Sequence, residues 1–274
     1  MPELPELEVI KNSLLHQITG KTVQALTIIK PYVLKNYFTD DLHDEIVADV
    51  QRRGKYILIF LKEHVMLIHL MLRGTLGFVL PSQRVRKAVA AVVHFTDGTV
   101  LELAERGHKK RVSLYIVPRH KLDAQLHVGV EPLDRSFTQR RLRQLLSKEP
   151  KRLKSFLHDQ HTIAGIGSAY ADEILWSSRL SPFKLTTNMD HRETKRLYTA
   201  IRGVLTWAID EVEKGGVSDK REFLRVHGKK NKPCPRCQTP IQSVHASGSE
   251  TYYCPNCQTR GRKLKDGRMS KFYR

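Results

Sequence analysis

The sequence predicts an α+β fold in which a helix and a β-sandwich domain precede a helical domain and a small module that contains all the cysteines. Three observations lead to this prediction. Apolar residues recur with helical spacing in 7–18 and in several segments between 138 and 214. From Thr22 to about Val117, short β-rich runs alternate with turn signals. The four cysteines of the 274-residue chain lie between positions 234 and 257.

The first domain is expected to cover residues 1–127. Its helix spans 7–18 and ends at Gly20, and Asp97-Gly98 marks one of the turns between strands. The clearest strand runs are 56–60, 65–69, 91–95 and 112–116. Many short strands separated by turns favour a sandwich or a barrel-like sheet.

A connector at 128–135 leads into a helical second domain, expected at 128–226. Its helices are predicted at 139–146, 152–158, 168–178 and 192–213. The third domain, 227–274, contains the cysteines and a basic tail.

The cysteines form two Cys-x-x-Cys pairs, Cys234 with Cys237 and Cys254 with Cys257, separated by sixteen residues. This spacing is typical of a tetrahedral site in which four thiolates bind one zinc ion. Two disulfides or a redox pair are the alternatives. The chain shows no signal peptide, so we expect a reducing compartment in which disulfides are rare. We therefore predict one structural zinc ion with no coordination position left for catalysis.

The first six residues, Met1-Pro-Glu-Leu-Pro-Glu6, place a reactive amine beside carboxylates. Removal of Met1 would leave Pro2 as a secondary amine with a pKa of about 8, against about 10.4 for a lysine side chain. Such an amine is partly uncharged at neutral pH and can attack an aldehyde-level carbon to form an iminium. Glu3 and Glu6 share one face of a helix that begins here, where they can serve in acid–base chemistry. The simpler alternative is an acidic first turn that stabilises the helix dipole.

The formal net charge of +19, from 47 Lys and Arg against 28 Asp and Glu, predicts a polyanionic partner. Residues 220–274 hold fourteen Lys and Arg and three acids, and His108-Lys-Lys-Arg111 is a second basic cluster. A solvated basic tail is the alternative to nucleic-acid binding. No apolar run is long enough to span a membrane, so we expect no membrane partner.

The segment 163–173 contains a glycine turn that leads into a helix. Gly165 and Gly167 keep the turn free of side chains, and Ser168 is expected to cap the helix. A helix N-terminus with exposed amides can bind phosphate. An ordinary helix hairpin is the alternative.

Together these features resemble the formamidopyrimidine-DNA glycosylase/endonuclease VIII family of base-excision repair enzymes. The resemblance runs from Pro2 to about Gln258. It rests on the segments 2–6, 51–56, 69–70, 131–133, 165–173 and 215–216 and on the four cysteines. It implies a bacterial-type enzyme with a helix–two-turns–helix domain and a β-hairpin zinc finger. Such an enzyme clamps duplex DNA, flips out a damaged base and excises it.

The resemblance implies that Pro2 attacks the sugar C1′, that Glu3 is the acid/base which helps to open the sugar, and that Glu6 supports the amine. Lys55 is implied to hold a phosphate beside the lesion. The iminium acidifies the neighbouring sugar carbon, so eliminations that nick the strand follow. The residues implied to contact DNA are His69, Leu72, Lys109, Lys110, Arg111, Lys154, Gly167, Ser168 and Arg260.

The chain departs from the family pattern at two phosphate ligands. Ser168 stands where the family usually has Asn, and Ser249 stands near the position of a zinc-finger Arg. Each charged contact can contribute about 1 kcal/mol or more. Arg260 or Arg262 is the candidate to replace the missing Arg.

Further departures lie where the family fills the gap left by the flipped base. Leu72 stands where Met is common, and 105–111 replaces the usual Asp-Pro-Arg-Arg-Phe-Gly loop. The segment between Gly216 and the finger is short and leaves little room for a loop that closes over 8-oxoguanine.

Three hypotheses follow. The leading one is a monomeric glycosylase and AP lyase of the bacterial cytoplasm, associated with the nucleoid while it works, that acts on double-stranded DNA containing an oxidised or ring-opened base or an abasic site. The second is a DNA-binding paralogue that recognises abasic or distorted DNA with little excision. The third is a zinc-finger binder of nucleic acid, for example RNA, whose N-terminal acids only cap a helix.

Overall fold

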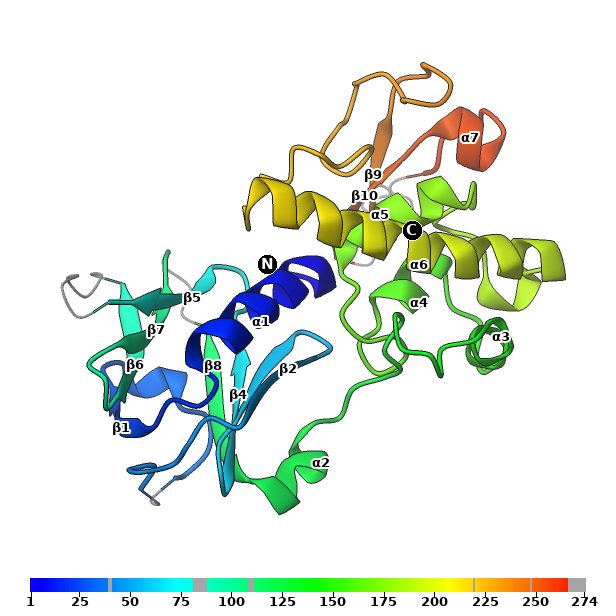
Figure 1. The fold of residues 1–274 in the computed structure, drawn as a ribbon. Coiled ribbons are helices and arrows are strands. Elements are labelled where there is room, and N and C mark those ends of the chain that lie inside the picture. Colours follow the sequence, from blue (N-terminus) through cyan, green and yellow to red (C-terminus); the bar gives the residue numbers. More distant parts are fainter. Residues whose placement is uncertain (39–40, 81–87, 108–110, 219, 247, 266–274) are drawn as a thin grey trace, which may run out of the picture. The chain divides into compact units, whose positions relative to one another are not determined.

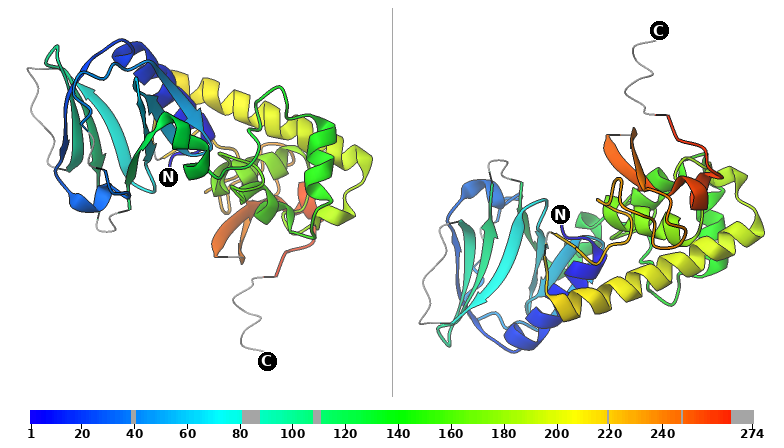
Figure 2. Two further views of the ribbon diagram at one scale, coloured as in Figure 1. Left: turned by 90° about the horizontal axis from the view of Figure 1, so that it is seen from below. Right: turned by 90° about the horizontal axis from the view of Figure 1, so that it is seen from above.

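The computed structural model describes residues 1–38, 41–80, 88–107, 111–218, 220–246 and 248–265. The chain divides into two compact units, Met1–His127 and Val128–Arg274. Figures 1 and 2 show both units, with most helices and strands labelled in Figure 1. None of the helices in the described residues has the length and apolarity needed to cross a membrane.

The first unit opens with helix α1 (Leu4–Ile18). Pro5 lies in its first turn, where its missing N–H costs no intrahelical hydrogen bond. Glu3 is the N-cap and forms a capping box with Glu6. The helix therefore begins before the predicted range 7–18, because its first turn is set by capping rather than by apolar spacing.

In the described part of this unit, eight strands form two four-stranded antiparallel sheets. The first sheet has the order β1 (Val23–Ile28), β6 (Val89–Phe95), β7 (Val100–Glu105) and β5 (Gly74–Val79). The second has the order β2 (Asp49–Arg53), β3 (Tyr56–Phe60), β4 (His64–His69) and β8 (Ser113–Pro118). Short helices η1 (Pro31–Val33), η2 (Arg119–Lys121) and α2 (Leu122–Gln125) complete the unit.

One hydrophobic core joins the two sheets. Val93 and Leu101 from the first sheet and Ile57 and Met66 from the second belong to the same buried cluster. Alternate residues of each strand contribute to it, as expected when two sheets pack face to face. Helix α1 contacts β2 and β3, and three of its apolar residues, Leu7, Leu14 and Ile18, enter the core. The predicted β-sandwich is confirmed.

The second unit is built around helix α5 (Ser168–Ser177), whose residues 169–176 are all buried. It contacts the long helix α6 (His191–Gly215) and helix α4 (Leu153–His158). Helix α6 begins at a capping box formed by Asp190 and Glu193. Helix α3 (Gln139–Leu146) packs against α6. The short helix η3 (Thr186–Asn188) precedes α6 in the chain.

The hairpin of β9 (Gln242–Ala246) and β10 (Ser249–Tyr253) follows, and the short helix α7 (Pro255–Thr259) lies next in sequence. Both β10 and α7 contact α5. The helical segment and the cysteine module therefore share one compact unit.

Candidate functional site

The N-terminus of α1 holds two buried carboxylates. Glu3 is 4% exposed and Glu6 is 1% exposed. Oε2 of Glu6 accepts the backbone N–H of Glu3 at 2.8 Å. The positive end of the helix dipole stabilises acidic groups at this position. Pro2, which is half-buried, immediately precedes this pair, so the capping box fixes the backbone next to the predicted nucleophile.

Lys55 and His69 lie close together on the second sheet. Lys55 lies in the β2–β3 turn and is 5% exposed, and His69 pairs with Tyr56 in the β3–β4 ladder. Burial, and then the charge of Lys55, lower the pKa of His69 to about 4. His69 is therefore a neutral imidazole at physiological pH. Its ring meets that of Tyr56 edge-on, with centroids 4.9 Å apart.

The turn after β4 presents Leu72 to solvent. Its side chain is 52% exposed. Met71 before it has a φ of 52°, and Gly74 after it has no room for a Cβ, which would lie 2.3 Å from the carbonyl oxygen of Leu70. Non-glycine residues rarely adopt a positive φ. The turn is thus tightly constrained and leaves an apolar side chain at its tip.

The segment after β7 is tied to this turn. The N–H of Arg106 donates to the carbonyl of Arg73, and the buried Glu105 accepts the N–H groups of Arg111 and Val112 at 2.8 and 3.2 Å. Arg111 is exposed. The predicted DNA contacts Lys109 and Lys110 lie outside the described residues.

Gly167, not Ser168, is the N-cap of α5. This corrects the prediction: Gly167 has extended backbone angles (φ −119°, ψ −163°), so the helix begins with Ser168. The Ser168 hydroxyl donates to the carbonyl of Glu250 in β10 at 3.5 Å. Gly165 has a φ of +84°, a conformation that favours glycine. The side chain of Gln160 accepts the N–H of Gly165 and donates to the carbonyl of Ile166, which fixes the loop.

Lys154 is buried beneath the β9–β10 hairpin. Its ammonium group contacts Oδ1 of Asp172 at 2.8 Å and donates to the carbonyl of Glu250 at 2.8 Å. Only 7% of Lys154 is exposed. Its contact with DNA stays a prediction; the described contacts join α4, α5 and β10.

Sequence reasoning did not single out the two acids at the centre of this network. Oδ2 of Asp172 lies 2.7 Å from Nδ1 of His227 and accepts the N–H of Tyr252 at 3.2 Å. Glu173 accepts three consecutive backbone N–H groups, from residues 225–227. Burial raises the pKa of Glu173, opposed by these hydrogen bonds. The only sequence signal was the adjacency of two acids in an otherwise apolar helix.

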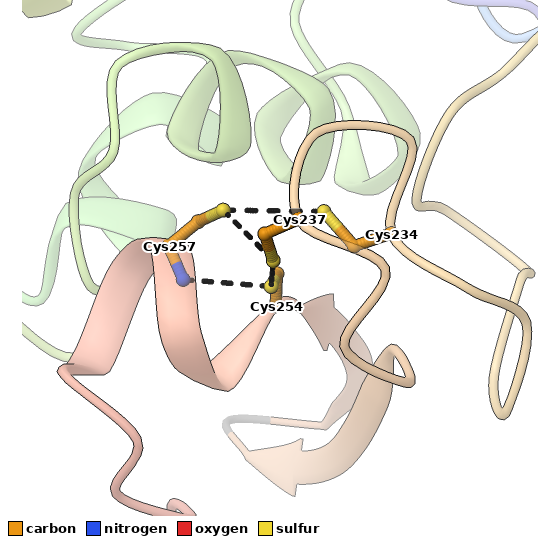
Figure 3. A group of neighbouring side chains, drawn as sticks. All are labelled: Cys234, Cys237, Cys254 and Cys257. Atoms are coloured by element: carbon orange, nitrogen blue, oxygen red, sulfur yellow. Dashed lines mark hydrogen bonds between the residues drawn. The ribbon is translucent and has the colours of Figure 1, made fainter.

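The four cysteines converge between the 234–237 turn and the start of α7 (Figure 3). Their sulfur atoms all lie within 4.8 Å of one another. The Cys237 sulfur lies 3.4 Å from those of Cys254 and Cys257, and the Cys234 sulfur lies 3.9 Å from that of Cys257. Four sulfurs at about 2.3 Å from one metal in a tetrahedron lie about 3.8 Å apart. No disulfide joins them. This donor set fits one zinc ion with a purely structural role, and the indole N–H of Trp176 donates to the Cys234 sulfur at 3.3 Å.

Two further predicted positions lie in this module. Ser249 opens β10 opposite Ala246. Arg260 is exposed and ends α7 with a left-handed φ of 52°. The structure therefore leaves a positive side chain at the end of α7; its contact with DNA stays a prediction.

The described part of the short segment after Gly216 folds back onto the second unit. The Phe223 ring meets that of Trp207 edge-on at 5.5 Å, and Leu224 and Val226 are buried. Arg221 lies 5.2 Å from the centre of the Tyr170 ring. Phe223, Leu224 and Val226 thus hold the second half of this segment by packing, whereas Val217, Ser218 and Lys220 are exposed.

Three family models match the chain. Residues 1–108 match the formamidopyrimidine-DNA glycosylase N-terminal domain, and 128–221 match the H2TH domain of the same enzymes. Residues 231–260 match a zinc finger found in FPG and IleRS. The three matches follow one another in the order expected from the resemblance.

The chain is also similar to complete proteins. It is 34% identical to formamidopyrimidine-DNA glycosylase of Pelotomaculum thermopropionicum, over 94% of this chain and 99% of the relative. It is 32% identical to that of Shouchella clausii, over 95% and 100%. Among solved structures, Lactococcus lactis Fpg bound to abasic-site DNA gives a TM-score of 0.85 at 25% identity, with 94% of this chain and 99% of that chain covered. An L. lactis Fpg mutant bound to Fapy-dG DNA gives 0.85 at 26% identity, with 94% and 100% covered.

Proposed function

Because the chain belongs to the formamidopyrimidine-DNA glycosylase family, we propose that it is a base-excision repair glycosylase and AP lyase that works through Pro2. It acts on duplex DNA that contains a damaged base or an abasic site. The observation that carries the proposal is the position of Pro2 directly before the buried Glu3–Glu6 capping box.

The chemistry starts when Met1 is removed and the Pro2 nitrogen becomes a secondary amine. The neutral amine attacks C1′ of the damaged nucleotide, the C1′–N bond to the base breaks, and the base leaves with a proton. Opening of the sugar ring then gives an iminium between Pro2 and C1′. Loss of a proton from C2′ expels the 3′ phosphate and nicks the strand.

Glu3 is placed to supply the proton that opens the sugar, since it is the carboxylate adjacent to the amine in sequence. Glu6 holds the backbone N–H of Glu3 and so positions the reacting residues. A carboxylate at a helix N-terminus is held in position because both its hydrogen bonds and the helix dipole oppose its movement.

Phosphate binding is assigned to neutral His69, to Lys55, to the start of α5 at Gly167 and Ser168, and to Arg260. Imidazole, ammonium and helix N–H groups are all common phosphate donors. Lys154, Lys109, Lys110 and Arg111 complete the proposed DNA-binding set. Zinc holds the finger folded and takes no part in the reaction.

Leu72 is the side chain proposed to enter the stack when the base leaves it, because it is apolar, exposed and fixed by a constrained turn. Oxidised or ring-opened bases are the expected substrates. The proposed setting is the bacterial cytoplasm and its nucleoid, with the enzyme acting as a monomer.

Borohydride trapping tests the proposal. The reagent reduces an iminium to a stable amine, so incubation with abasic-site DNA should give a crosslinked species. Peptide mapping should place the crosslink on Pro2. In the same chain with Met1 retained, the Pro2 nitrogen is part of a peptide bond and the free amine lies one residue out of place, so the chain should not be trapped. A crosslink at a lysine, or none at all, would reject Pro2 as the nucleophile.

A further inference from the structure

The second unit contains a pocket of about 840 Å³ on the exposed side of α6 that the proposed DNA chemistry does not use. Its wall on α6 runs from Arg192 through Arg196, Thr199 and Gly203 to Trp207. These positions share one face of a helix. The opposite wall is formed by Ser177 and Ser178, which lie at the C-terminal end of α5. The phosphate site proposed above uses the other end of α5.

The rim of this α6 pocket is basic. Its lining includes five basic residues and, among the described residues, no acid: His191, Arg192, Lys195, Arg196 and Arg225. Helix α6 begins at the acids Asp190 and Glu193, but these form the capping box, and Glu193 also pairs with Lys184 at 2.6 Å. The pocket therefore attracts a negatively charged ligand.

Its floor is apolar and aromatic. Ala200 and Val204 line it beside Trp207. The guanidinium carbon of Arg225 lies 4.0 Å from the centre of the Trp207 ring, and this cation–π contact holds the indole in place. A ligand that fits both floor and rim has acidic groups together with a hydrophobic anchor.

Gly203 keeps this floor open. A Cβ added there would meet no heavy atom within 4 Å, so packing does not require a glycine. Glycine inside a helix is less favourable than alanine. The missing side chain thus weakens the helix without any gain in packing, and its structural effect is an unobstructed pocket.

The length of the pocket indicates an extended ligand. Fifteen residue steps separate Arg192 from Trp207, which corresponds to about 22 Å along the helix axis. An extended peptide covers that distance in about seven residues. We propose that the α6 pocket docks an acidic peptide segment of a partner protein, with one or two hydrophobic side chains over Val204 and Trp207.

A nucleic-acid strand fits this surface less well. A sugar–phosphate backbone would satisfy the basic rim but leave the apolar floor without a partner. Binding of a single strand by base stacking also needs several exposed aromatic rings in succession along the path. Among the described residues that line the α6 pocket, Trp207 supplies the indole ring of the floor and no Phe or Tyr follows it.

The test uses the full chain and a fluorescein-labelled seven-residue peptide with five acidic residues followed by leucine and phenylalanine. Fluorescence anisotropy gives its dissociation constant. Two further peptides carry glutamine in place of the acids or serine in place of the hydrophobic pair. Binding should require both features, because rim and floor recognise different groups.

Two matched pairs of variants locate the site. Gly203→Phe fills the floor, whereas Gly203→Ala leaves it open. Lys195→Glu reverses a charge of the rim, whereas Lys214→Glu makes the same change on α6 outside the pocket. Gly203→Phe and Lys195→Glu should each weaken peptide binding at least about tenfold, while the two controls stay within about twofold. Borohydride trapping on abasic-site DNA should be unchanged in all four.

Three outcomes would overturn the proposal. The first is an unmodified chain that does not bind the acidic, hydrophobic peptide. The second is equal weakening by Lys195→Glu and Lys214→Glu, which would indicate a general charge effect. The third is a loss of affinity for undamaged DNA in Gly203→Phe, which would assign the pocket to nucleic acid. Because trapping is followed separately, none of these results depends on whether Pro2 is the nucleophile.

Discussion

The backbone N–H of Met71 donates a hydrogen bond to Nδ1 of His69 over 3.0 Å. This bond uses the lone pair of Nδ1, so the neutral ring carries its proton on Nε2. Burial first, and the charge of Lys55 second, lower the pKa of His69 to about 4 and keep the ring neutral. Nε2–H of His69, at the end of β4, is therefore a fixed hydrogen-bond donor beside the Leu72 turn.

The first prediction concerns the pH dependence that follows. In the unfolded chain His69 titrates near about 6.5, whereas in the folded protein it takes up its proton only near pH 4. Between these values the unfolded state binds more protons, so the free energy of unfolding should fall as the pH is lowered from 6.5 to 4.

His69→Asn keeps an acceptor for the Met71 N–H but cannot titrate, so it should lose this part of the pH dependence. His16→Asn, which changes an exposed histidine of α1, is the control. Chemical denaturation at several pH values gives the measurement. An NMR titration that places His69 near pH 6.5 in the folded protein would refute the prediction.

The second prediction separates the roles of Pro2 and Glu3. Pro2→Gly retains a free α-amine after removal of Met1, so it should keep part of the nicking activity on a ready-made abasic site. Glu3→Gln should reduce base excision much more than nicking, because an abasic site has no base to release and its sugar opens to the aldehyde without an added acid. Single-turnover assays on paired substrates give both rates. Equal losses on both substrates in Glu3→Gln would argue against its role in opening the sugar.

The third prediction links the zinc site to Trp176, whose indole donates to the Cys234 sulfur. Cys234→Ser and Cys257→Ser should lower the zinc content below one ion per chain and reduce DNA affinity, while the β-sandwich stays folded. In a Trp207→Phe background Trp176 is the only tryptophan. Removal of zinc with a chelator should then change its fluorescence. A folded, DNA-binding preparation without zinc would contradict the assignment.

The fourth prediction concerns electrostatics. DNA affinity should fall steeply with salt, with a slope that steepens by about 0.9 for each phosphate neutralised. Lys55→Ala should lower the slope by about one such unit and weaken binding to all lesions alike, because a phosphate contact carries no base information. Lys62→Ala removes an exposed charge elsewhere in the same unit as a control. A flat salt response would exclude the polyanion interpretation of the +19 charge.

The features that sequence predicted well are those encoded over short distances. The cysteine pairs define the zinc site because each pair supplies two sulfurs from one turn. The run 56–60 is confirmed as β3, since it combines β-branched, aromatic and other apolar residues that favour strands. Strand β2, Asp49–Arg53, was missed because its charged side chains mask the alternating pattern.

The features that were missed depend on residues distant in sequence. Asp172 joins Lys154, His227 and Tyr252, and no local spacing reveals that they meet. The capping position of α5 was assigned to Ser168 from residue preference, but the extended backbone of Gly167 decides it. The α6 pocket was also invisible, because a basic helix face is usually a solvated surface.

The last prediction concerns substrate choice and the role of Leu72. The described part of the segment after Gly216 packs through Phe223, Leu224 and Val226. Apart from the exposed residues Val217, Ser218 and Lys220, it offers little chain to close over a flipped purine, so we expect selection to come from the pocket that receives the base. Few dedicated hydrogen bonds give weak discrimination. We expect weak activity on 8-oxoguanine and better activity on ring-opened purines, oxidised pyrimidines and abasic sites, which cost less to flip. Leu72→Ala should impair excision from duplex DNA more than from single strands, where no stack must be opened. Excision rates on matched duplex and single-stranded substrates give the comparison, with Leu80→Ala as a control at another exposed leucine. Efficient removal of 8-oxoguanine only when it lies opposite cytosine would show that a dedicated purine cap exists after all.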